Sequence, residues 1–454
     1  MSQPLEVGAT WLPAETGPHL WADLRPARAA ADLTAMRAAG LTSVRVHLAW
    51  DAFVPTHRQV SRQRLRDLDA VLEAARPLGI CVVLVLFAQS FGRGLLLPRY
   101  AIDPRRPRPG VQVVSGGVAE PGGPRDQWAD PLMLEVEVMW LEALLDSFAN
   151  HPAIAAWDLG HDPASTLRPR RTAHTVAWAE LLGGIVRARG DRVRLTLGAG
   201  DVLSARGIRL GALAPHLDEL GLLVEPQRLR LGGPVGAPDL EATAFTVQVA
   251  LRLASGDDRV APPLHVVTGI AAGEAADLEA AERGAEVEAA AARAAVRVSL
   301  GIDRQGGRPI QARGRVPEAE AVPEWEVPLL DPPRAARTGG ELLTRLQDSG
   351  VAGVTATSWT TLSDRVALAA PLDRRPSLAR HGLALPGGEL RAAGEPWAAL
   401  ARAEREAGTP QPWPAHLDPE QYYAALPDAA RDLLAGWRSE RGEAGRLERL
   451  DGPI

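Results

Sequence analysis

Short apolar runs alternate along the chain with longer segments of helical period. The runs stay almost entirely apolar until their carboxyl ends, which is typical of parallel strands whose two faces are both covered. Alternation of such strands with helices predicts an α/β fold built from strand–helix units. The expected strands are Val7–Trp11, Ser43–Trp50, Cys81–Phe87, Ala153–Leu159, Arg192–Gly198, Glu219–Pro226, Pro263–Gly269 and Gly353–Asp364.

Helical segments fill the intervals between these strands. The clearest are Arg25–Gly40, Arg62–Gly79, Pro131–Asn150, an Ala- and Glu-rich stretch over 274–300, and Gly340–Gly350. Eight strands with intervening helices predict a (β/α)8 TIM barrel, which places its functional site at the C-terminal ends of the strands.

Three segments depart from the regular alternation. A long loop over 88–130 follows the third strand, and a Pro- and Arg-rich insertion over 301–340 precedes the eighth. Loops of such length in compact domains are usually functional or disordered. We expect a barrel over 1–404 and, over 405–454, a linker with a short C-terminal helical appendage.

Composition narrows the function classes. A net charge of -6 and a pI near 6.0 give no basic face for nucleic acid. No apolar run reaches the roughly 18 residues of a membrane span, and no signal-peptide pattern opens the chain, so we expect a cytoplasmic protein. Cys81, the only cysteine, is predicted to pack in the core, and the absence of lysine excludes a lysine Schiff base. No cofactor is predicted.

The strand ends carry a resemblance to a known family. The stretches "GLTSVRVHLAWDAFVP", "DPLMLEVEVMWLEALLDSFANHPAIAAWDLGHDP" and "PLDRRPSLARHGLALPGGELRAAGEPWAAL" are similar to glycoside hydrolases of the β-mannanase and cellulase type, related to family 5 in the clan of retaining (β/α)8-barrel enzymes. The similarity spans roughly residues 5 to 400. It implies a glycosidase scaffold and an oligosaccharide or glycoside as ligand.

The resemblance fails at the fourth strand end, where the family carries Trp-Asp-Leu-Gly-Asn-Glu-Pro. This chain has His161 and Asp162 in place of the Asn and the acid/base Glu. An aspartate carboxyl sits about 1.5 Å further back than a glutamate carboxyl, and misplacement by about 1 Å can cost about a hundredfold in rate. The resemblance therefore implies impaired acid/base chemistry at Asp162.

The strands that should carry and orient the nucleophile depart as well. The seventh offers Thr268 or Gly269 where the family has a Glu, and the sixth has Leu223, Val224 and Glu225 in place of a His and Tyr pair. Retaining hydrolysis needs two carboxylates about 5 Å apart. The second carboxylate is missing from its expected place.

Other positions keep residues that the family uses. Arg45 matches an arginine beneath the nucleophile, for which we favour a buried hydrogen-bond network over ligand contact. Trp359 matches the tryptophan that floors the sugar subsite; packing and stacking are equally expected. His47, Trp50, Trp157 and His161 complete the candidate substrate-binding residues, since indole faces are platforms for sugar rings.

Other carboxylates or a metal ion are alternatives at these strand ends. Glu225, Glu274 and Asp364 follow strands six, seven and eight, and any of them could pair with Asp162 at the roughly 6.5–9.5 Å separation used in inversion. Solvated loop residues or helix caps are the simpler interpretation of each. His47, His161 and Asp162 form a possible ligand set, but nothing in their spacing is diagnostic, and no metal is predicted.

Three functional hypotheses follow, and whether the chain is an enzyme stays open. The leading one is a glycoside-hydrolase-like pseudoenzyme that has lost standard retaining catalysis, with carbohydrate binding as an activity it could retain. The second is a slow or inverting glycosidase acting on β-linked sugars, with Asp162 as general acid. The third is a scaffold protein without a sugar ligand, which docks through the 88–130 loop or the C-terminal appendage.

Overall fold

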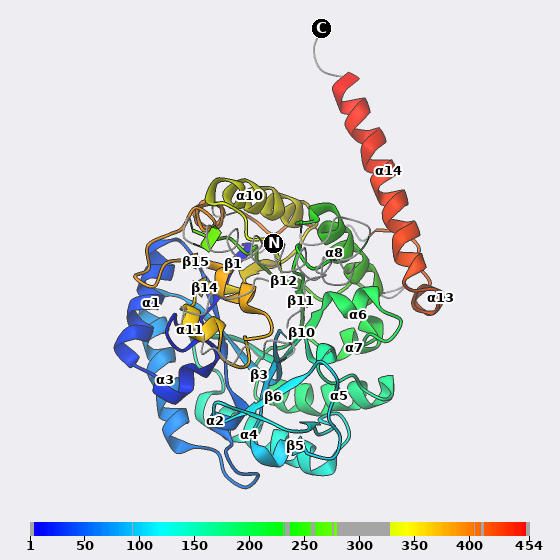
Figure 1. Cartoon of the computed structure of the whole chain (residues 1–454). Coiled ribbons are helices and arrows are strands. Elements are labelled where there is room, and N and C mark those ends of the chain that lie inside the picture. Colours follow the sequence, from blue (N-terminus) through cyan, green and yellow to red (C-terminus); the bar gives the residue numbers. More distant parts are fainter. Residues whose placement is uncertain are drawn as a thin grey trace, which may run out of the picture.

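The computed structural model describes residues 4–92, 94–229, 231, 237–255, 259–274, 277–278, 327–403, 405–409 and 413–450. Eight parallel strands form a closed barrel at its centre (Figure 1). The pairing of β2 with β3 closes the ring. The barrel strands are β1 (Glu6–Thr10), β2 (Ser43–His47), β3 (Cys81–Phe91), β9 (Ile154–His161), β10 (Val193–Gly198), β11 (Glu219–Leu223), β12 (Leu264–Thr268) and β13 (Gly353–Ala356). The predicted (β/α)8 barrel is confirmed.

Helices surround the barrel (Figure 1). Each main helix follows a barrel strand and buries its apolar side; α1 ends before Gly40, whose φ of 96° stops the helix, as the sequence predicts. The α-helices are α1 (Pro26–Ala38), α2 (Trp50–Phe53), α3 (Arg62–Ala75), α4 (Pro131–Phe148), α5 (Thr172–Ala188), α6 (Ala199–Leu203), α7 (Leu210–Leu213), α8 (Leu240–Ala254), α10 (Pro332–Asp348), α11 (Asp364–Ala367), α12 (Glu395–Arg402), α13 (Pro419–Ala424) and α14 (Asp428–Leu450). The 3-10 helices are η1 (Gly17–Asp23), η2 (Arg76–Leu78), η3 (Arg99–Ala101), η4 (Pro163–Ser165), η5 (Ala214–His216) and η6 (Pro376–Arg380).

The predicted long loop after the third strand contains short strands. β4 pairs antiparallel with the end of β3, and β6 and β7 continue the same sheet. The chain thus extends the third barrel strand beyond the barrel mouth before α4 begins. These strands are β4 (Gly94–Leu96), β5 (Ile102–Asp103), β6 (Gln112–Ser115), β7 (Val118–Glu120) and β8 (Gly123–Pro124).

Two expectations need correction. The eighth barrel strand is shorter than predicted and ends at Ala356, because Ser358–Thr360 forms β14, which pairs with β15 (Gly382–Ala384) in a separate sheet. Cys81 is exposed, since it is the first residue of its strand and lies at the barrel rim.

The helix predicted over 274–300 lies almost wholly outside the described residues. Most of the 301–340 insertion does so too, although α10 begins within its last part.

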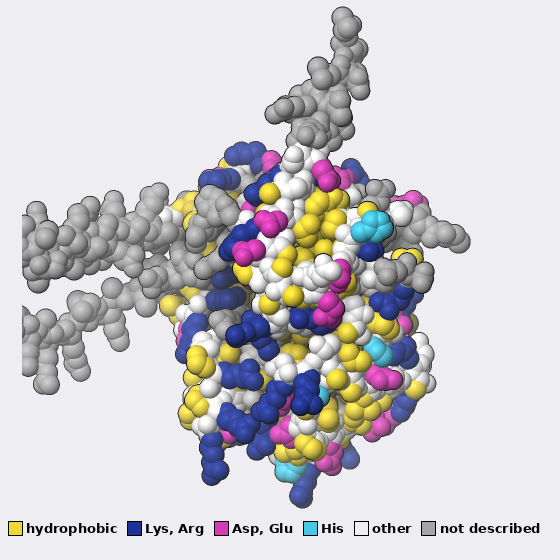
Figure 2. All heavy atoms as spheres, turned by 90° about the vertical axis from the view of Figure 1, so that its right-hand side faces the viewer, with side chains coloured by type: hydrophobic (Ala, Val, Ile, Leu, Met, Phe, Trp, Pro, Cys, Tyr) yellow, Lys and Arg dark blue, Asp and Glu magenta, His cyan; other side chains and the backbone are white. Residues whose placement is uncertain are grey.

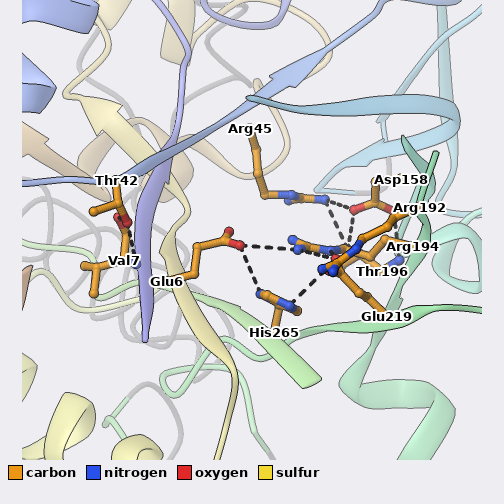
Figure 3. Close-up of polar contacts among 10 residues, drawn as sticks. All are labelled: Glu6, Val7, Thr42, Arg45, Asp158, Arg192, Arg194, Thr196, Glu219 and His265. Atoms are coloured by element: carbon orange, nitrogen blue, oxygen red, sulfur yellow. Dashed lines mark hydrogen bonds and ion pairs between the residues drawn. The ribbon is translucent and has the colours of Figure 1, made fainter. Parts of the chain in front are cut away.

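Charged side chains occupy the N-terminal end of the barrel interior (Figure 3). Arg194 donates to Glu219 at 2.6 and 2.9 Å and lies 3.5 Å from Glu6. His265 lies 3.5 Å from Glu6 and 3.7 Å from Glu219. Barrel interiors are usually filled by branched apolar residues. Here the buried charges are tolerated because each faces a charge of opposite sign or a polar partner.

The C-terminal helices pack against the outside of the barrel. The rings of Trp413 and Trp437 lie 5.2 Å apart and both contact Phe245 of α8. Farther along, α14 extends away from the barrel (Figure 1). Figure 2 shows arginine side chains gathered on the lower part of this flank. None of the helices in the described part of the chain is both long and apolar enough to cross a membrane.

Candidate functional site

The end of β9 brings Asp162 to the barrel mouth. Asp162 is the first residue after the strand and adopts the left-handed backbone conformation, with φ of 49°. Its backbone N–H donates to the Thr196 carbonyl at 2.9 Å. A Cβ on Gly198 would lie only 2.1 Å from the Asp162 carboxyl oxygen Oδ1. Gly198, at the end of β10, is therefore the residue type that leaves room for this carboxyl.

Asp162 holds its proton unusually tightly. Burial raises the pKa of its carboxyl to about 8, and the negative charges of Asp201 and Glu225 add to the effect. Ser165, by hydrogen bonding, and the positive charge of Arg375 offset part of it. The carboxyl is therefore mostly protonated at neutral pH, the state that a general acid needs.

Arg45 lies beneath the mouth in a buried hydrogen-bond network (Figure 3). It donates to Asp158 Oδ2 at 2.6 Å and to Thr196 Oγ1 at 3.1 Å. Its third contact is with His161 Nδ1 at 3.3 Å. Since a guanidinium only donates, His161 Nδ1 accepts and its Nε2 carries the ring proton. Burial and the Arg45 charge hold the pKa of His161 well below its usual value, so the ring is neutral.

An inner cavity of about 40 Å³ lies directly above this network. His47, His161, Asp162, Glu225 and Arg375 supply its main polar side chains, and Arg45 does not border it. The volume is enough for a few water molecules. It is far below the roughly 300–1,000 Å³ of typical ligand pockets, so a sugar ring does not fit at this depth in this conformation.

An outer cavity of about 260 Å³ adjoins the inner one. The two share Asp162 and Arg375, and the outer cavity adds Ser165, Arg168 and Asp201. Asp162 thus stands at the boundary between a small closed space and a larger polar one.

Asp201 organises the loop that forms one wall of the outer cavity. Its carboxylate accepts hydrogen bonds from the backbone of Gly198 at 3.1 Å and of Ile208 at 2.7 Å. Burial raises the pKa of Asp201 to about 6, while these two hydrogen bonds and the charge of Arg168 oppose the rise. The side chain is therefore mostly ionised at neutral pH and ties the two ends of the loop together.

The three substitute carboxylates have different positions. Glu225 borders the inner cavity with Asp162 and pairs with Arg228 at 3.3 Å and Arg375 at 3.8 Å. Glu274 instead pairs with Arg391 at 2.8 Å. Asp364 accepts from Arg380 at the start of α11. Neither Glu274 nor Asp364 borders the inner or the outer cavity, so the structure brings only Glu225 to Asp162.

The end of β12 carries no carboxylate, and the space beside Gly269 is already filled. Thr268 is buried, and its carbonyl accepts from the Thr357 backbone at 2.9 Å. A Cβ on Gly269 would lie 2.2 Å from Thr357 Oγ1 and 3.1 Å from His381 Nδ1. The side chains of Thr357 and His381 therefore fill the space that a residue larger than glycine would need.

The candidate tryptophans lie in the core. Trp50, Trp157 and Trp359 are at most 1% exposed, and none borders the inner or the outer cavity. Trp50 donates its Nε1–H to the Tyr100 hydroxyl at 3.0 Å. Sugar stacking by these rings stays a prediction.

The two histidines of the possible metal set are neighbours. The rings of His47 and His161 lie 5.0 Å apart at nearly right angles. Within the residues that the structure describes, no group of three or more His, Cys, Asp or Glu side chains is arranged to hold a metal ion.

Three residues of the site went unnoticed in the sequence. Asp201 stands three residues after the end of the fifth strand in "LTLGAGD", and a carboxylate close to a strand end is a usable signal. Arg168 and Arg375 lie in loops more than 200 residues apart, and no local pattern marks either one. Only the folded barrel places them beside Asp162 and Asp201.

Solved structures of other proteins share this arrangement of strands and helices. The exo-beta-1,4-mannosidase Op5Man5 from Opitutaceae bacterium strain TAV5 aligns with a TM-score of 0.64 at 17% identity. The match covers 89% of this chain and 60% of that one. GH5_18 from Streptomyces cattleya, in complex with GlcNAc, aligns with a TM-score of 0.64 at 16% identity over 90% of this chain and 83% of that one.

A GH5_18 variant from Bifidobacterium longum subsp. longum ATCC 55813, in complex with Manb1-4GlcNAc, gives a TM-score of 0.63 at 15% identity. That match covers 90% of this chain and 80% of the other. The chain has the glycoside hydrolase family 5-like (β/α)8 fold. No protein-family model matches the sequence, and the curated proteins give no match. The family 5-like barrel is therefore established from structure, and its function must be argued from the site.

Proposed function

We propose that this family 5-like barrel binds a glycoside at its mouth and has lost retaining hydrolysis. The observation that carries the proposal is the end of β12, where Thr357 and His381 fill the space beside Gly269. Retaining hydrolysis needs a nucleophilic carboxylate about 5 Å from the acid/base group. With Thr268 and Gly269 at this strand end, no such carboxylate is in place.

Polar groups suited to sugar hydroxyls remain at the mouth. Protonated Asp162 donates and accepts, and His161 carries its ring proton on Nε2 at the edge of the inner cavity. The inner cavity is too small for a sugar ring, whereas the outer cavity offers about 260 Å³ beside the same aspartate. The ligand therefore lies over Asp162 in the outer cavity.

A second function has one specific observation in its favour. Asp162, protonated at neutral pH, borders the same cavity as Glu225. An acid and a base facing one space are the equipment of an inverting glycosidase, in which the base activates water. This alternative is a slow hydrolase of β-linked sugars with Asp162 as acid and Glu225 as base.

The two functions separate in one set of assays. Aryl β-mannoside, glucoside, galactoside and xyloside, together with β-mannan, are incubated with the purified chain and with the Asp162→Ala and Glu225→Gln variants. We expect no turnover above the Asp162→Ala background. Titration calorimetry with the same sugars should then show binding that Asp162→Ala weakens by up to about tenfold, because a hydrogen bond between neutral groups contributes roughly 0.5–1.5 kcal/mol.

Asp146→Asn provides the matched control, because this aspartate lies on the surface with 66% of its side chain exposed. Turnover that disappears in both cavity variants and persists in the control would replace the binding proposal by the inverting glycosidase. Absence of both turnover and binding would overturn both functions and leave a scaffold protein.

A further inference from the structure

Two loops beside α5 carry a cluster of arginines. The first loop covers 104–110, between β5 and β6, and the second covers 166–171, between η4 and α5. Arg108 Nη1 of the first loop lies 3.5 Å from the Thr166 carbonyl oxygen of the second. The two loops therefore form one continuous surface. Its arginines, which we call the arginine patch, are Arg105, Arg106, Arg108, Arg170 and Arg171.

Two aspartates pair with arginines of the patch. Arg106 lies 3.6 Å from Asp103, and Arg170 lies 3.8 Å from Asp126. Asp126 also acts on Arg108. Burial lowers the pKa of the Arg108 guanidinium, the charge of Asp126 opposes this fall, and the charge of Arg170 adds to it. One carboxylate therefore serves two guanidinium groups.

The remaining arginines leave the patch with a positive surplus. Arg105 and Arg171 are exposed, and neither forms an ion pair with any residue in the described part of the chain. Five arginines thus face two aspartates, a surplus of three positive charges. Two neighbouring ion pairs are neutral and do not change this balance: Arg99 with Glu120 at 2.9 Å, and Arg125 with Asp130 at 3.4 Å.

The patch adjoins the outer cavity without depending on its charges. Arg168 borders that cavity and lies in the second loop, two residues before Arg170. The charge of Asp201 acts on Arg168, and Arg375 of the same cavity lies 3.8 Å from Glu225. The surplus therefore lies outside the cavity, on the flank where Figure 2 shows arginine side chains gathered in the lower part. A surface of one sign concentrates ligands of the opposite charge.

The composition of the two loops narrows the class of partner. None of their large apolar side chains is exposed, so the patch lacks the apolar centre of a protein–protein interface. Neither loop carries an aromatic residue on which the bases of a single-stranded nucleic acid could stack. A sugar polymer with anionic groups needs neither feature, and it alone continues from a glycoside held in the outer cavity.

We propose that the arginine patch binds an acidic polysaccharide, whose carboxylates lie on the arginines while one of its sugars occupies the outer cavity. The inference rests on the proposed glycoside binding and names the class of ligand. A guanidinium binds a carboxylate through two parallel N–H donors, an arrangement that a neutral hydroxyl cannot use as fully. The patch therefore distinguishes a charged polymer from a neutral one.

Oligosaccharides of equal length test the proposal on the full chain. A β-1,4-oligomannuronate and a β-1,4-oligomannoside differ only in the carboxylate at carbon 6 of each sugar. Calorimetry at low salt should show the oligomannuronate binding about tenfold more tightly, as expected of several exposed ion pairs acting together. The difference should shrink as sodium chloride rises toward about 1 M, because salt screens exposed charges.

Two variants at exposed arginines locate the effect without disturbing the core. Arg105→Gln and Arg171→Gln should each weaken binding of the oligomannuronate about threefold, the size of effect that one exposed ion pair gives. Binding of the oligomannoside should stay unchanged. Arg37→Gln is the matched control, because Arg37 is exposed on α1, across the barrel from α5, and its loss changes the net charge equally (Figure 1).

The outcomes separate this inference from the proposed function. Equal affinity for the two oligosaccharides overturns the role of the patch and leaves glycoside binding intact. An equal loss in Arg37→Gln shows that net charge acts in place of the patch. Oligoglutamate that binds as tightly as the oligomannuronate overturns the polysaccharide as partner. If oligomannuronate binding is the same in Asp162→Ala, the cavity holds no sugar and the proposed function fails, whereas the patch variants still report on the patch.

Discussion

The two ends of the barrel interior hold charge in different ways. At the N-terminal end, Arg194 lies between Glu219 and Glu6 (Figure 3). Glu219 also forms an ion pair with Arg192 at 3.2 Å. Burial alone would lower the pKa of Arg194, yet Glu6 and Glu219 raise it overall. At the C-terminal end, Asp162 keeps its proton because burial and nearby carboxylates outweigh Arg375.

The contrast separates structure from chemistry. A buried arginine with carboxylate partners on several strands holds those strands together, and the partners raise its pKa so that it stays charged. A buried carboxyl with a raised pKa beside a cavity is costly to the fold, and such groups cluster at functional sites. The two ends should therefore respond in opposite ways to mutation and to pH.

The largest expected effect is at the N-terminal end. Arg194→Met removes the cation from between Glu219 and Glu6 and leaves carboxylates buried without it. Breaking a buried pair on one side costs roughly 3–5 kcal/mol, which urea unfolding at pH 7 will measure. Arg192→Met is the control, because its side chain is 61% exposed and contacts the same Glu219; its loss should stay below about 1 kcal/mol. Equal losses would show that burial of the pair is not what matters.

Asp162→Asn should act in the opposite direction. The folded carboxyl has a pKa of about 8 against an ordinary value of 3.8, so the folded state holds a proton that the unfolded chain releases between those pH values. The contribution of Asp162 to stability is complete below about pH 4 and is lost by about pH 8. The variant should therefore gain over the parent chain as pH rises, by ~2–4 kcal/mol at pH 8 and above. This is less than the full ~1.36 kcal/mol per tenfold change in proton affinity would give, because Asp162 is partly exposed and solvent screens its charge.

Urea unfolding of the parent and variant between pH 4 and pH 9 measures this gain. Asp146→Asn should show a difference that does not change with pH over the same range. A flat difference for Asp162→Asn as well would mean that Asp162 is ionised in the folded protein, which would also remove its suitability as a general acid.

The sequence predicted the barrel because the signals for its strands are local. Each apolar run and its flanking turn lie within about ten residues, and all eight strands were recognised. The break after Ala356 was missed, because only the pairing of β14 with β15 shows where the barrel strand ends.

The site was less predictable, because its packing depends on residues from different strands. Gly198 looks like an ordinary turn glycine, yet it leaves the room that the Asp162 carboxyl occupies. Gly269, directly after β12, is the same residue type, but there Thr357 and His381 fill the space. Sequence showed that a carboxylate was missing there, and only the fold showed what took its place.

His265→Gln should make the protein less sensitive to acid. Burial and the charge of Arg194 lower the pKa of His265 to about 3, against an ordinary value of 6.5. Between these pH values the unfolded chain binds a proton at His265 and the folded chain does not. The contribution of neutral His265 to the free energy of unfolding is therefore fully present above about pH 6.5 and is lost as pH falls toward 3. The variant lacks this loss, so its stability should fall by ~3 kcal/mol less than that of the parent between pH 6.5 and pH 4.

Thermal unfolding across this range tests the difference. His57→Gln, at an exposed histidine outside the barrel interior, should follow the parent. If His265→Gln loses stability toward acid as steeply as the parent, the acid sensitivity lies elsewhere, for example in protonation of Glu6 and Glu219.

The smallest expected effect concerns the support that the C-terminal helix α13 gives to the cavity end of the barrel. Tyr423 of α13 donates its hydroxyl to the Asp201 carbonyl at 3.0 Å, and its ring lies against the Arg209 guanidinium, 3.8 Å from the ring centre. Tyr422 donates to the Val202 carbonyl at 3.1 Å. Both hydroxyls thus hold the loop that Asp201 closes from within.

Tyr423→Phe removes the hydrogen bond to the Asp201 carbonyl and a longer one, of 3.5 Å, to the Ile208 carbonyl, and it should cost only about 1 kcal/mol in global stability. Amide hydrogen exchange over 198–208 should nevertheless become faster, because that segment loses an outside anchor. Tyr100→Phe is the control: its partly buried hydroxyl donates to the Val54 carbonyl and accepts from Trp50, both at 3.0 Å, so it should cost at least as much and leave exchange over 198–208 unchanged. If Tyr423→Phe leaves that exchange unchanged as well, the Tyr423 hydroxyl does not anchor the loop, and Asp201 and Tyr422 hold it without that hydroxyl.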